Sequence, residues 1–353
     1  MENFVSSSQL EKLGSFLSVK GKRYLFYHQD ADGVCSAALW MRFFQGFETR
    51  AREGPRIEEA FVQELLEEQP ELMVFLDLPV DQEAEKVKRL SKIPGCRIII
   101  IDHHIPEEDM SNENILHINP KFREDVYLPA SYLVYRILEK LDKKVEPLIW
   151  MSVIGVIGDY GFKECRELLD KCRTKYPDLL YVRPLESKLG KGAELISAAI
   201  TLKGLRGAAR ALDILVRAKN YKEFAENRFL LQWKGIVQKE IDKILEEFKE
   251  KKEEYPELNL IVYSIESKLS VSSVISSILA RLYPDDIIIV KKKTDSGHWK
   301  LSVRSQTGLI NVGENIKKCV KGIGSGGGHK KAGGALVQNW DTFKERFFKL
   351  LVS

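Results

Sequence analysis

The sequence is poor in cysteine, and its few cysteines form no pair motif. The 353 residues include five cysteines, none of them arranged as CxxC. An odd number of scattered thiols argues against a disulfide framework and against a zinc ribbon. We therefore expect reduced thiols and a cytoplasmic protein. The five are Cys35, Cys96, Cys165, Cys172 and Cys319.

Long apolar runs are also missing. The stretch from Leu148 to Gly158 is far shorter than the roughly 20 apolar residues that cross a bilayer. The N-terminal segment carries Glu2, Glu11 and Lys12, so it does not resemble a signal peptide. We expect no membrane partner. The net charge is only +4, so any affinity for nucleic acid has to come from a local patch.

The chain is long enough for two domains with separate cores, and its 44% hydrophobic and 30% charged residues are typical of a globular protein. Strand and helix patterns alternate to about residue 160, which predicts a doubly wound parallel α/β sheet. We expect the domain that contains this sheet to cover residues 1–220. A long helix over 221–256 would connect it to a smaller α/β domain over 257–353, with strands near 259–265, 287–291 and 299–303.

Acidic residues and histidines follow four apolar runs. The first three runs, at 24–27, 72–76 and 97–101, are short and rich in Ile, Val and aromatics, as parallel strands buried on both faces are. In an open α/β sheet, sites form at the carboxyl ends of the strands. The polar residues after the four runs are His28, Asp30 and Asp32; then Asp77; then Asp102, His103 and His104; and finally Asp159.

These residue types indicate metal chemistry. Imidazole and carboxylate together suit Zn, Mn, Fe or Co rather than Ca. Two such ions about 3.5–4 Å apart favour in-line phosphoryl chemistry. A single Asp after a strand is most often a turn residue or a helix cap. Four successive clusters, one of them with adjacent histidines, instead favour a two-metal phosphoesterase site.

The motifs resemble those of a known family. In their order, HQDADG at 28–33, Asp77, Asp102-His103-His104 and Gly158-Asp159 are similar to the four motifs of the DHH phosphoesterase family. Far downstream, SVRS at 302–305 and GGGHKKAGG at 326–334 are similar to the DHHA1 domain of its RecJ-like branch. The resemblance is closest to compact archaeal RecJ-like exonucleases, including a type that associates with a repair helicase.

The resemblance also implies roles for the residues. One metal would be held by His28, Asp30 and Asp77, and the other by Asp32, Asp77, His103 and Asp159, with Asp77 as the bridging carboxylate. Asp102 would orient a histidine, and His104 would contact the substrate. The expected ions are two Mn²⁺, with Mg²⁺ or Co²⁺ as replacements. The first motif begins with His rather than the Asp of bacterial RecJ, which leaves the metal preference open.

A second set of residues would hold the substrate phosphate. Arg304, on a strand edge, stands in the family's Ser-x-Arg-Ser pattern, and this resemblance implies a bidentate contact with the phosphate. The glycine run at 322–327 matches GxGxxG only weakly and could be a flexible turn. We favour an anion nest, a turn whose backbone N–H groups converge on a phosphate. The substrate set is His104, Ser302, Arg304, Gly326, Gly327, Gly328 and His329.

From the family we expect a metal-dependent exonuclease with its metal site in the cleft between the domains. It would release mononucleotides from single-stranded DNA or RNA, with attack from the 3′ end favoured. DNA repair or replication and a repair helicase partner are the expected setting. The alternatives are hydrolysis of short oligoribonucleotides, 3′-phosphoadenosine 5′-phosphate, cyclic dinucleotides or polyphosphate, and a non-catalytic replisome module. Polarity, DNA or RNA preference and oligomeric state stay open.

Overall fold

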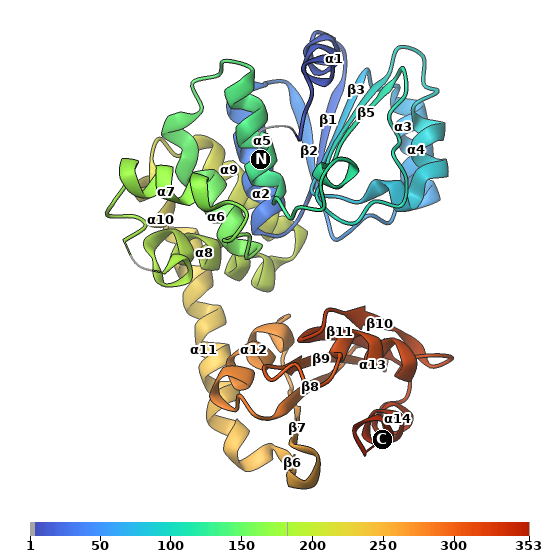
Figure 1. Ribbon diagram of the computed structural model, residues 1–353, viewed down its shortest axis with the longest axis vertical. Coiled ribbons are helices and arrows are strands. Elements are labelled where there is room, and N and C mark those ends of the chain that lie inside the picture. The colour runs from blue at the N-terminus through green and yellow to red at the C-terminus, as the bar shows by residue number, and fades with distance from the viewer. Residues whose placement is uncertain (1–3, 182, 353) are drawn as a thin grey trace. The chain divides into compact units, whose positions relative to one another are not determined.

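The computed structural model describes residues 4–181 and 183–352. The chain divides into an N-terminal unit that ends at Lys234 and a C-terminal unit that begins at Gly235 (Figure 1). The division lies inside α11 (Arg228–Lys251), within the range expected to connect the domains. None of the described helices has the length and apolarity needed to cross a membrane.

The connecting segment is not one continuous helix, which corrects the expectation for 221–256. The short helix α10 (Tyr221–Ala225) comes first, and α11 starts three residues later. Asn227 begins the second helix, because its side-chain oxygen accepts a hydrogen bond from the backbone N–H of Phe229 at 3.1 Å. Asn is a strong N-cap, so the second helix begins there.

The N-terminal sheet is parallel throughout, with strand order β2-β1-β3-β4-β5. The strands expected at 24–27, 72–76 and 97–101 are confirmed as β1, β3 and β4. The edge strand β2 is less buried than these three. The five strands are β1 (Arg23–His28), β2 (Phe47–Arg52), β3 (Leu72–Leu76), β4 (Arg97–Ile101) and β5 (Ile115–Ile118).

Helices cover both faces of this sheet, so the doubly wound prediction is confirmed. Side chains alternate along β1: Leu25 and Tyr27 join one hydrophobic cluster, whereas Tyr24 and Phe26 join the other. The first cluster includes residues of α1 (Ser7–Leu17), α2 (Ala31–Phe43) and α5 (Ala130–Lys140). The second includes residues of α3 (Glu59–Glu68) and α4 (Ala84–Leu90).

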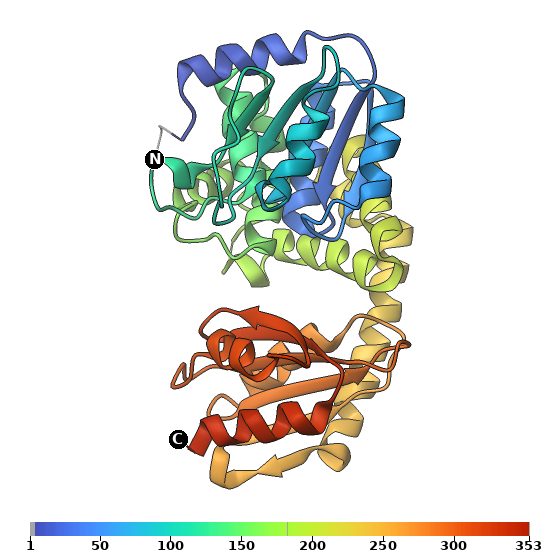
Figure 2. The same ribbon diagram turned by 90° about the vertical axis from the view of Figure 1, so that its right-hand side faces the viewer.

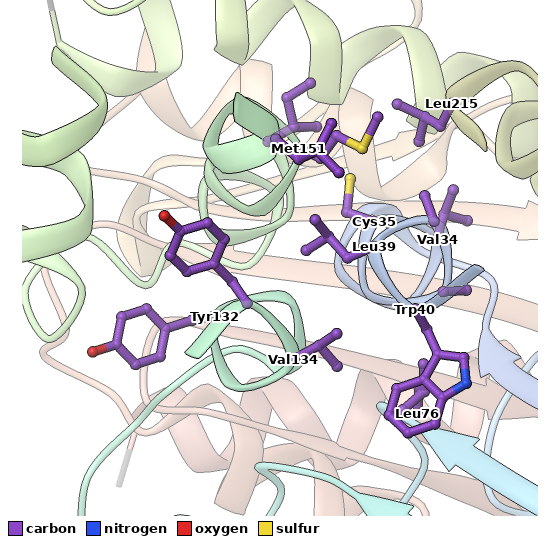
Figure 3. Packing of buried hydrophobic residues seen from close by; sticks show 14 of the residues in the cluster. Val34, Cys35, Leu39, Trp40, Leu76, Tyr132, Val134, Met151 and Leu215 are labelled. Atoms are coloured by element: carbon purple, nitrogen blue, oxygen red, sulfur yellow. The ribbon is translucent and has the colours of Figure 1, made fainter. Parts of the chain in front are cut away.

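Helix α2 lies between the sheet and an outer layer of helices (Figure 1). Every residue from Ala31 to Trp40 is buried. Figure 3 shows Val34 and Leu39 of α2 among side chains that include Met151 and Leu215 of the outer helices. A helix that is apolar on all sides belongs in a core. The outer helices are α6 (Ile149–Gly158), α7 (Arg166–Lys175), α8 (Lys188–Lys203) and α9 (Leu205–Arg217).

The C-terminal unit has a mixed sheet with strand order β10-β11-β9-β8-β7-β6, in which only β7 and β8 pair in parallel. The strands expected near 259–265, 287–291 and 299–303 are confirmed as β7, β8 and β9. Figure 2 shows α14 alongside this sheet. The elements are β6 (Glu253–Tyr255), β7 (Leu260–Ser264), α12 (Ser272–Leu282), β8 (Ile287–Lys293), β9 (Trp299–Ser305), α13 (Val312–Cys319), β10 (Gly324–Gly328), β11 (Ala332–Val337) and α14 (Trp340–Val352).

Five short 3₁₀ helices complete the described elements. They are η1 (Val80–Glu83), η2 (Pro120–Phe122), η3 (Glu146–Leu148), η4 (Pro184–Glu186) and η5 (Pro256–Leu258).

The glycine run forms a strand, which corrects both the nest and the flexible-turn interpretations of Gly326, Gly327 and Gly328. These residues belong to β10 and pair antiparallel with β11. Close packing of β11 and α13 explains Gly326. A Cβ at Gly326 would lie 2.6 Å from the Gly334 oxygen and 2.8 Å from Ile316 Cγ2. A helix can approach a hairpin this closely only where side chains are absent.

We predict opposite effects for two glycine-to-alanine changes. Gly313→Ala would place its Cβ 2.2 Å from the backbone oxygen of Gly328. Its free energy of unfolding should fall by roughly 1–3 kcal/mol. Gly235 is exposed within α11, and a Cβ added there would meet nothing within 4 Å among the described residues. Gly235→Ala should therefore raise the free energy of unfolding by about 1 kcal/mol. Urea unfolding of both variants measures the difference, and equal effects would contradict the packing argument.

Candidate metal centre

The structure brings the polar residues of the first three motifs to the carboxyl ends of the strands in the N-terminal sheet. His28 is the last residue of β1, Asp77 follows β3, and Asp102 follows β4. These strands are parallel, so their carboxyl ends meet. The fourth motif arrives differently. Its apolar run lies in helix α6, and Asp159 is the C-cap of that helix.

A tight turn places the first motif. Asp30 caps α2, and its Oδ1 accepts a hydrogen bond from the Gly33 N–H at 2.9 Å. A Cβ at Gly33 would lie 2.1 Å from the His28 carbonyl oxygen. Glycine therefore lets α2 start directly against the strand end. Asp32 then lies in the first turn of this buried helix.

One group of possible ligands forms around His28. Its Nδ1 lies 3.0 Å from Asp30 Oδ2 and 3.5 Å from Asp77 Oδ2. These three residues offer ligand atoms within 4.8 Å of one another. The carboxylate of Asp77 is 1% exposed, and its Oδ2 has no hydrogen-bond partner among the described residues.

A second group forms around His103. Its Nε2 lies 3.1 Å from Asp77 Oδ1 and 3.5 Å from Asp159 Oδ2. Asp32, His103 and Asp159 also offer ligand atoms within 4.8 Å of one another. The two oxygens of Asp77 thus point to different groups, one toward His28 and the other toward His103. This is the arrangement that a carboxylate bridging two cations needs.

Asp102 and His104 form a pair beside these groups. Asp102 is fully buried, and its Oδ1 lies 2.8 Å from His104 Nδ1. Its Oδ2 accepts a hydrogen bond from the backbone N–H of His104 at 3.1 Å. Asn119 Nδ2 donates to the His104 carbonyl at 2.9 Å. These contacts hold the imidazole of His104 in one orientation.

The electrostatics of the centre favour bound cations. Burial and the negative charge of Asp30 raise the pKa of Asp77 well above its usual value. Burial and the charge of Asp77 do the same for the pKa of Asp32. Burial alone would lower the pKa of His28, but the Asp30 and Asp77 carboxylates raise it to about 11. Carboxylates this close repel one another, and divalent ions would relieve that repulsion.

No local pattern in the sequence indicated the contacts that hold Asp32. Its Oδ2 accepts from the backbone N–H of Ala130 at 2.5 Å, and its Oδ1 accepts from the Ser131 N–H at 3.0 Å. The Ser131 hydroxyl also donates to Oδ1. These donors lie in the first turn of α5, where unpaired N–H groups favour a negative charge. Residues 130 and 131 lie 98 and 99 positions from Asp32 in the chain, so only the fold reveals this contact.

Tyr127 is another residue that the sequence did not single out. Its hydroxyl donates to Asp159 Oδ2 and lies 3.2 Å from the Asp159 carbonyl oxygen. Its ring contacts the His103 ring edge-on, with centroids 5.0 Å apart. Tyr127 therefore fixes the carboxylate of the fourth motif.

The expected substrate residues other than His104 lie in the C-terminal unit. Ser302 and Arg304 are on β9, which is flanked by β11 and β8. Arg304 therefore lies on an inner strand of the sheet, which corrects the expectation of a strand edge. Its Nη2 donates to Ser273 Oγ at 2.8 Å, and its Nε donates to Ser277 Oγ at 3.3 Å. His329 is exposed just after β10.

Comparison with family models shows which family this chain belongs to. The model of the DHH family, N-terminal domain, matches residues 22–161. The model of the DHHA1 domain matches residues 257–351. The chain belongs to the DHH/DHHA1 family of metal-dependent phosphoesterases. The resemblance of the motifs is thereby confirmed, whereas the closeness to archaeal members stays a prediction. No curated protein sequence matches this DHH/DHHA1 chain.

Solved structures share the fold. RecJ from Thermus thermophilus in complex with Mn²⁺ superposes with a TM-score of 0.73 at 18% identity, over 98% of this chain and 54% of that one. This DHH/DHHA1 chain thus spans about half the length of that RecJ. An exonuclease RecJ bound to manganese gives 0.70 at 18% identity, over 98% and 94%. A pGpG-specific phosphodiesterase from Vibrio cholerae gives 0.53 at 15% identity, over 94% and 98%.

We predict that Ser131→Ala will weaken metal binding roughly 10–100-fold, because residues that hold a ligand typically contribute that much. The change removes the hydroxyl that donates to Asp32. Ser152→Ala is the matched control. Its equally buried hydroxyl donates to the Ser131 carbonyl at 3.0 Å and does not touch the carboxylate. Calorimetric Mn²⁺ titration measures both variants, and equal losses would show that packing, not the hydroxyl, matters.

Proposed function

We propose that this chain is a two-metal phosphodiesterase that releases mononucleotides from an end of single-stranded DNA or RNA. The observation that carries the proposal is that the two carboxylate oxygens of Asp77 face two different ligand groups. Its Oδ1 lies 3.1 Å from His103 and its Oδ2 lies 3.5 Å from His28. One buried carboxylate that faces two imidazoles fits a bridging ligand between two ions.

The proposed ligands follow from the two groups. His28, Asp30 and Asp77 would hold one ion, and Asp32, Asp77, His103 and Asp159 the other. Imidazole and carboxylate together suit Mn²⁺, our preferred ion, with Mg²⁺ or Co²⁺ as replacements. When bound, such a pair supplies a hydroxide near neutral pH and neutralises phosphate charge.

The chain's own residues would position the phosphate. Burial would lower the pKa of His104, but its contact with Asp102 raises it. The protonated imidazole can donate a hydrogen bond to a non-bridging phosphate oxygen. In the C-terminal unit, Ser273 and Ser277 hold Arg304, which leaves less side-chain entropy to lose on binding. His329 and Ser302 complete the proposed phosphate contacts.

Action at a chain end is the preferred mode because two structures that share the fold are named as RecJ, one of them as an exonuclease. Attack from the 3′ end follows the proposed closeness to archaeal relatives. DNA repair, a helicase partner and a cytoplasmic location belong to the same proposal. The pGpG-specific phosphodiesterase favours a second candidate, hydrolysis of dinucleotides or very short RNA.

Substrate length separates these candidates. Single-stranded DNA and RNA of several lengths, labelled at the 5′ or the 3′ end, should shorten stepwise with Mn²⁺, while blocked duplex ends resist. A ladder that shrinks from the 5′ end would reverse the polarity. Turnover confined to dinucleotides or 3′-phosphoadenosine 5′-phosphate would replace the exonuclease by the second candidate.

Asp77→Asn should abolish turnover and lower the affinity for both metals by more than roughly 100-fold, since even residues behind a ligand contribute 10–100-fold. Asn has the shape of Asp and tolerates the left-handed backbone at this position, where φ is +59°. The fold should therefore persist in circular dichroism. Exhaustive chelation of the wild-type protein should have the same effect on turnover. Activity that survived either treatment would exclude the two-metal scheme.

Arg304→Ala should raise KM roughly 10–100-fold, because a hydrogen bond to a charged group contributes about 1.5–3 kcal/mol. Metal content should stay unchanged, since the proposed ligands all lie in the N-terminal unit. Arg304→Lys is the matched control, and it should recover only part of the loss because lysine cannot bind bidentately. Elemental analysis of the purified variants checks the division of roles, which metal loss would contradict.

A further inference from the structure

Tyr160 directly follows the proposed ligand Asp159 and is 68% exposed. Most large aromatic side chains of this unit are buried, whereas the ring of Tyr160 is left largely in solvent. Its ring contacts Phe162 with centroids 6.0 Å apart. Tyr160 is thus an exposed aromatic residue that is joined in the chain to a proposed metal ligand.

The backbone at Tyr160 closes helix α6 by a Schellman motif. The Gly161 N–H donates to the Val156 carbonyl at 3.0 Å, and the Tyr160 N–H donates to the Ile157 carbonyl at 3.3 Å. Tyr160 is the C′ residue of this motif, with a φ of +57°. Glycine, and less often asparagine, occupies this position, because a Cβ is disfavoured in the left-handed region.

The motif therefore explains the backbone but not the side chain. A glycine would close α6 with less strain, and burial does not offset the strain of the tyrosine, since its ring is mostly in solvent. Strained residues of this kind cluster at functional sites. Ile105, which follows His104, is 78% exposed, but it has an ordinary backbone and no flat ring.

We propose that Tyr160 stacks on the nucleobase next to the scissile phosphate. This inference rests on the proposed function and deepens it, because it assigns a base-bearing phosphodiester as the substrate class. The Cα atoms of Tyr160 and Asp159 are about 3.8 Å apart, as in any trans peptide. In this proposal the ring lies against the base attached to a phosphate at the metals. Stacking tolerates all bases, so it suits a nuclease without sequence preference. Polyphosphate has no base and would gain nothing from the ring.

The experiment measures the wild type and two Tyr160 variants on two substrates. Tyr160→Gly removes the ring and relieves the backbone, whereas Tyr160→Phe keeps the ring. Each is measured on an oligonucleotide with an intact terminal nucleotide and on one with an abasic terminus, at each end in turn. The wild type and Tyr160→Phe should lose roughly 10-fold or more in kcat/KM on the abasic substrate. For Tyr160→Gly, kcat/KM on the abasic substrate should be less than about 2-fold below kcat/KM on the intact substrate. The main reason is that the KM of this variant for the intact substrate has already risen.

Stability separates a contact with the substrate from a structural role. The unfolding midpoint of Tyr160→Gly should be unchanged or higher, because glycine suits the C′ position. Tyr181→Gly is the control for a loss of exposed aromatic surface, since Tyr181 is 61% exposed and lies between α7 and α8. This control should discriminate against the abasic substrate as the wild type does.

A binding signal keeps the inference distinct from the proposed function. A terminal 2-aminopurine should lose fluorescence on mixing with the wild type, before any turnover, and should keep it with Tyr160→Gly. If the wild type cleaves no single strand but quenches the base through Tyr160, the exonuclease proposal fails and the stacking inference stands. Quenching or abasic discrimination that Tyr160→Gly fully retains would overturn the inference.

Discussion

Mutual repulsion among buried carboxylates is the constraint on which the N-terminal unit depends. Asp32 and Asp77 are almost fully buried and lie close to one another and to Asp159. Burial of a charge is unfavourable unless it is paired. The chain meets this requirement only in part, with imidazoles against Asp77 and helix N–H groups against Asp32. The remaining negative charge favours cations at this centre.

The core of the unit holds these charges in place against their repulsion. Asp30 and Asp32 belong to the start of α2, and the ten residues from Ala31 to Trp40 are buried between the sheet and the outer helices. A helix packed on all sides cannot withdraw from the strand ends to separate the charges. The Asp32 carboxylate is also tied to α5, and Asp159 is held by Tyr127. The arrangement is therefore prepared before any ion binds, which lowers the reorganisation needed on binding.

Much of this fold could be predicted from the sequence, because buried parallel strands are short apolar runs with recognisable residues after them. The strands β1, β3 and β4 and their motifs required no tertiary information. The rest depended on contacts between distant segments. Ser131 supports Asp32 across 99 positions, and no local pattern records such a pairing. The glycines of β10 resembled a turn because glycine permits many conformations, whereas close packing of β11 and α13 explains Gly326.

The residues assigned to catalysis and to binding differ in how the chain holds them, and this difference bears on the substrate. Burial fixes Asp77, a proposed ligand, and Asp102, which orients His104. Arg304 is oriented by serine hydroxyls, and Tyr160 is presented by the backbone of a helix terminus. Under the proposals above, Arg304 serves a phosphate and Tyr160 serves a base. A substrate with a phosphate but no base would use only one of these contacts, whereas a nucleotide would use both.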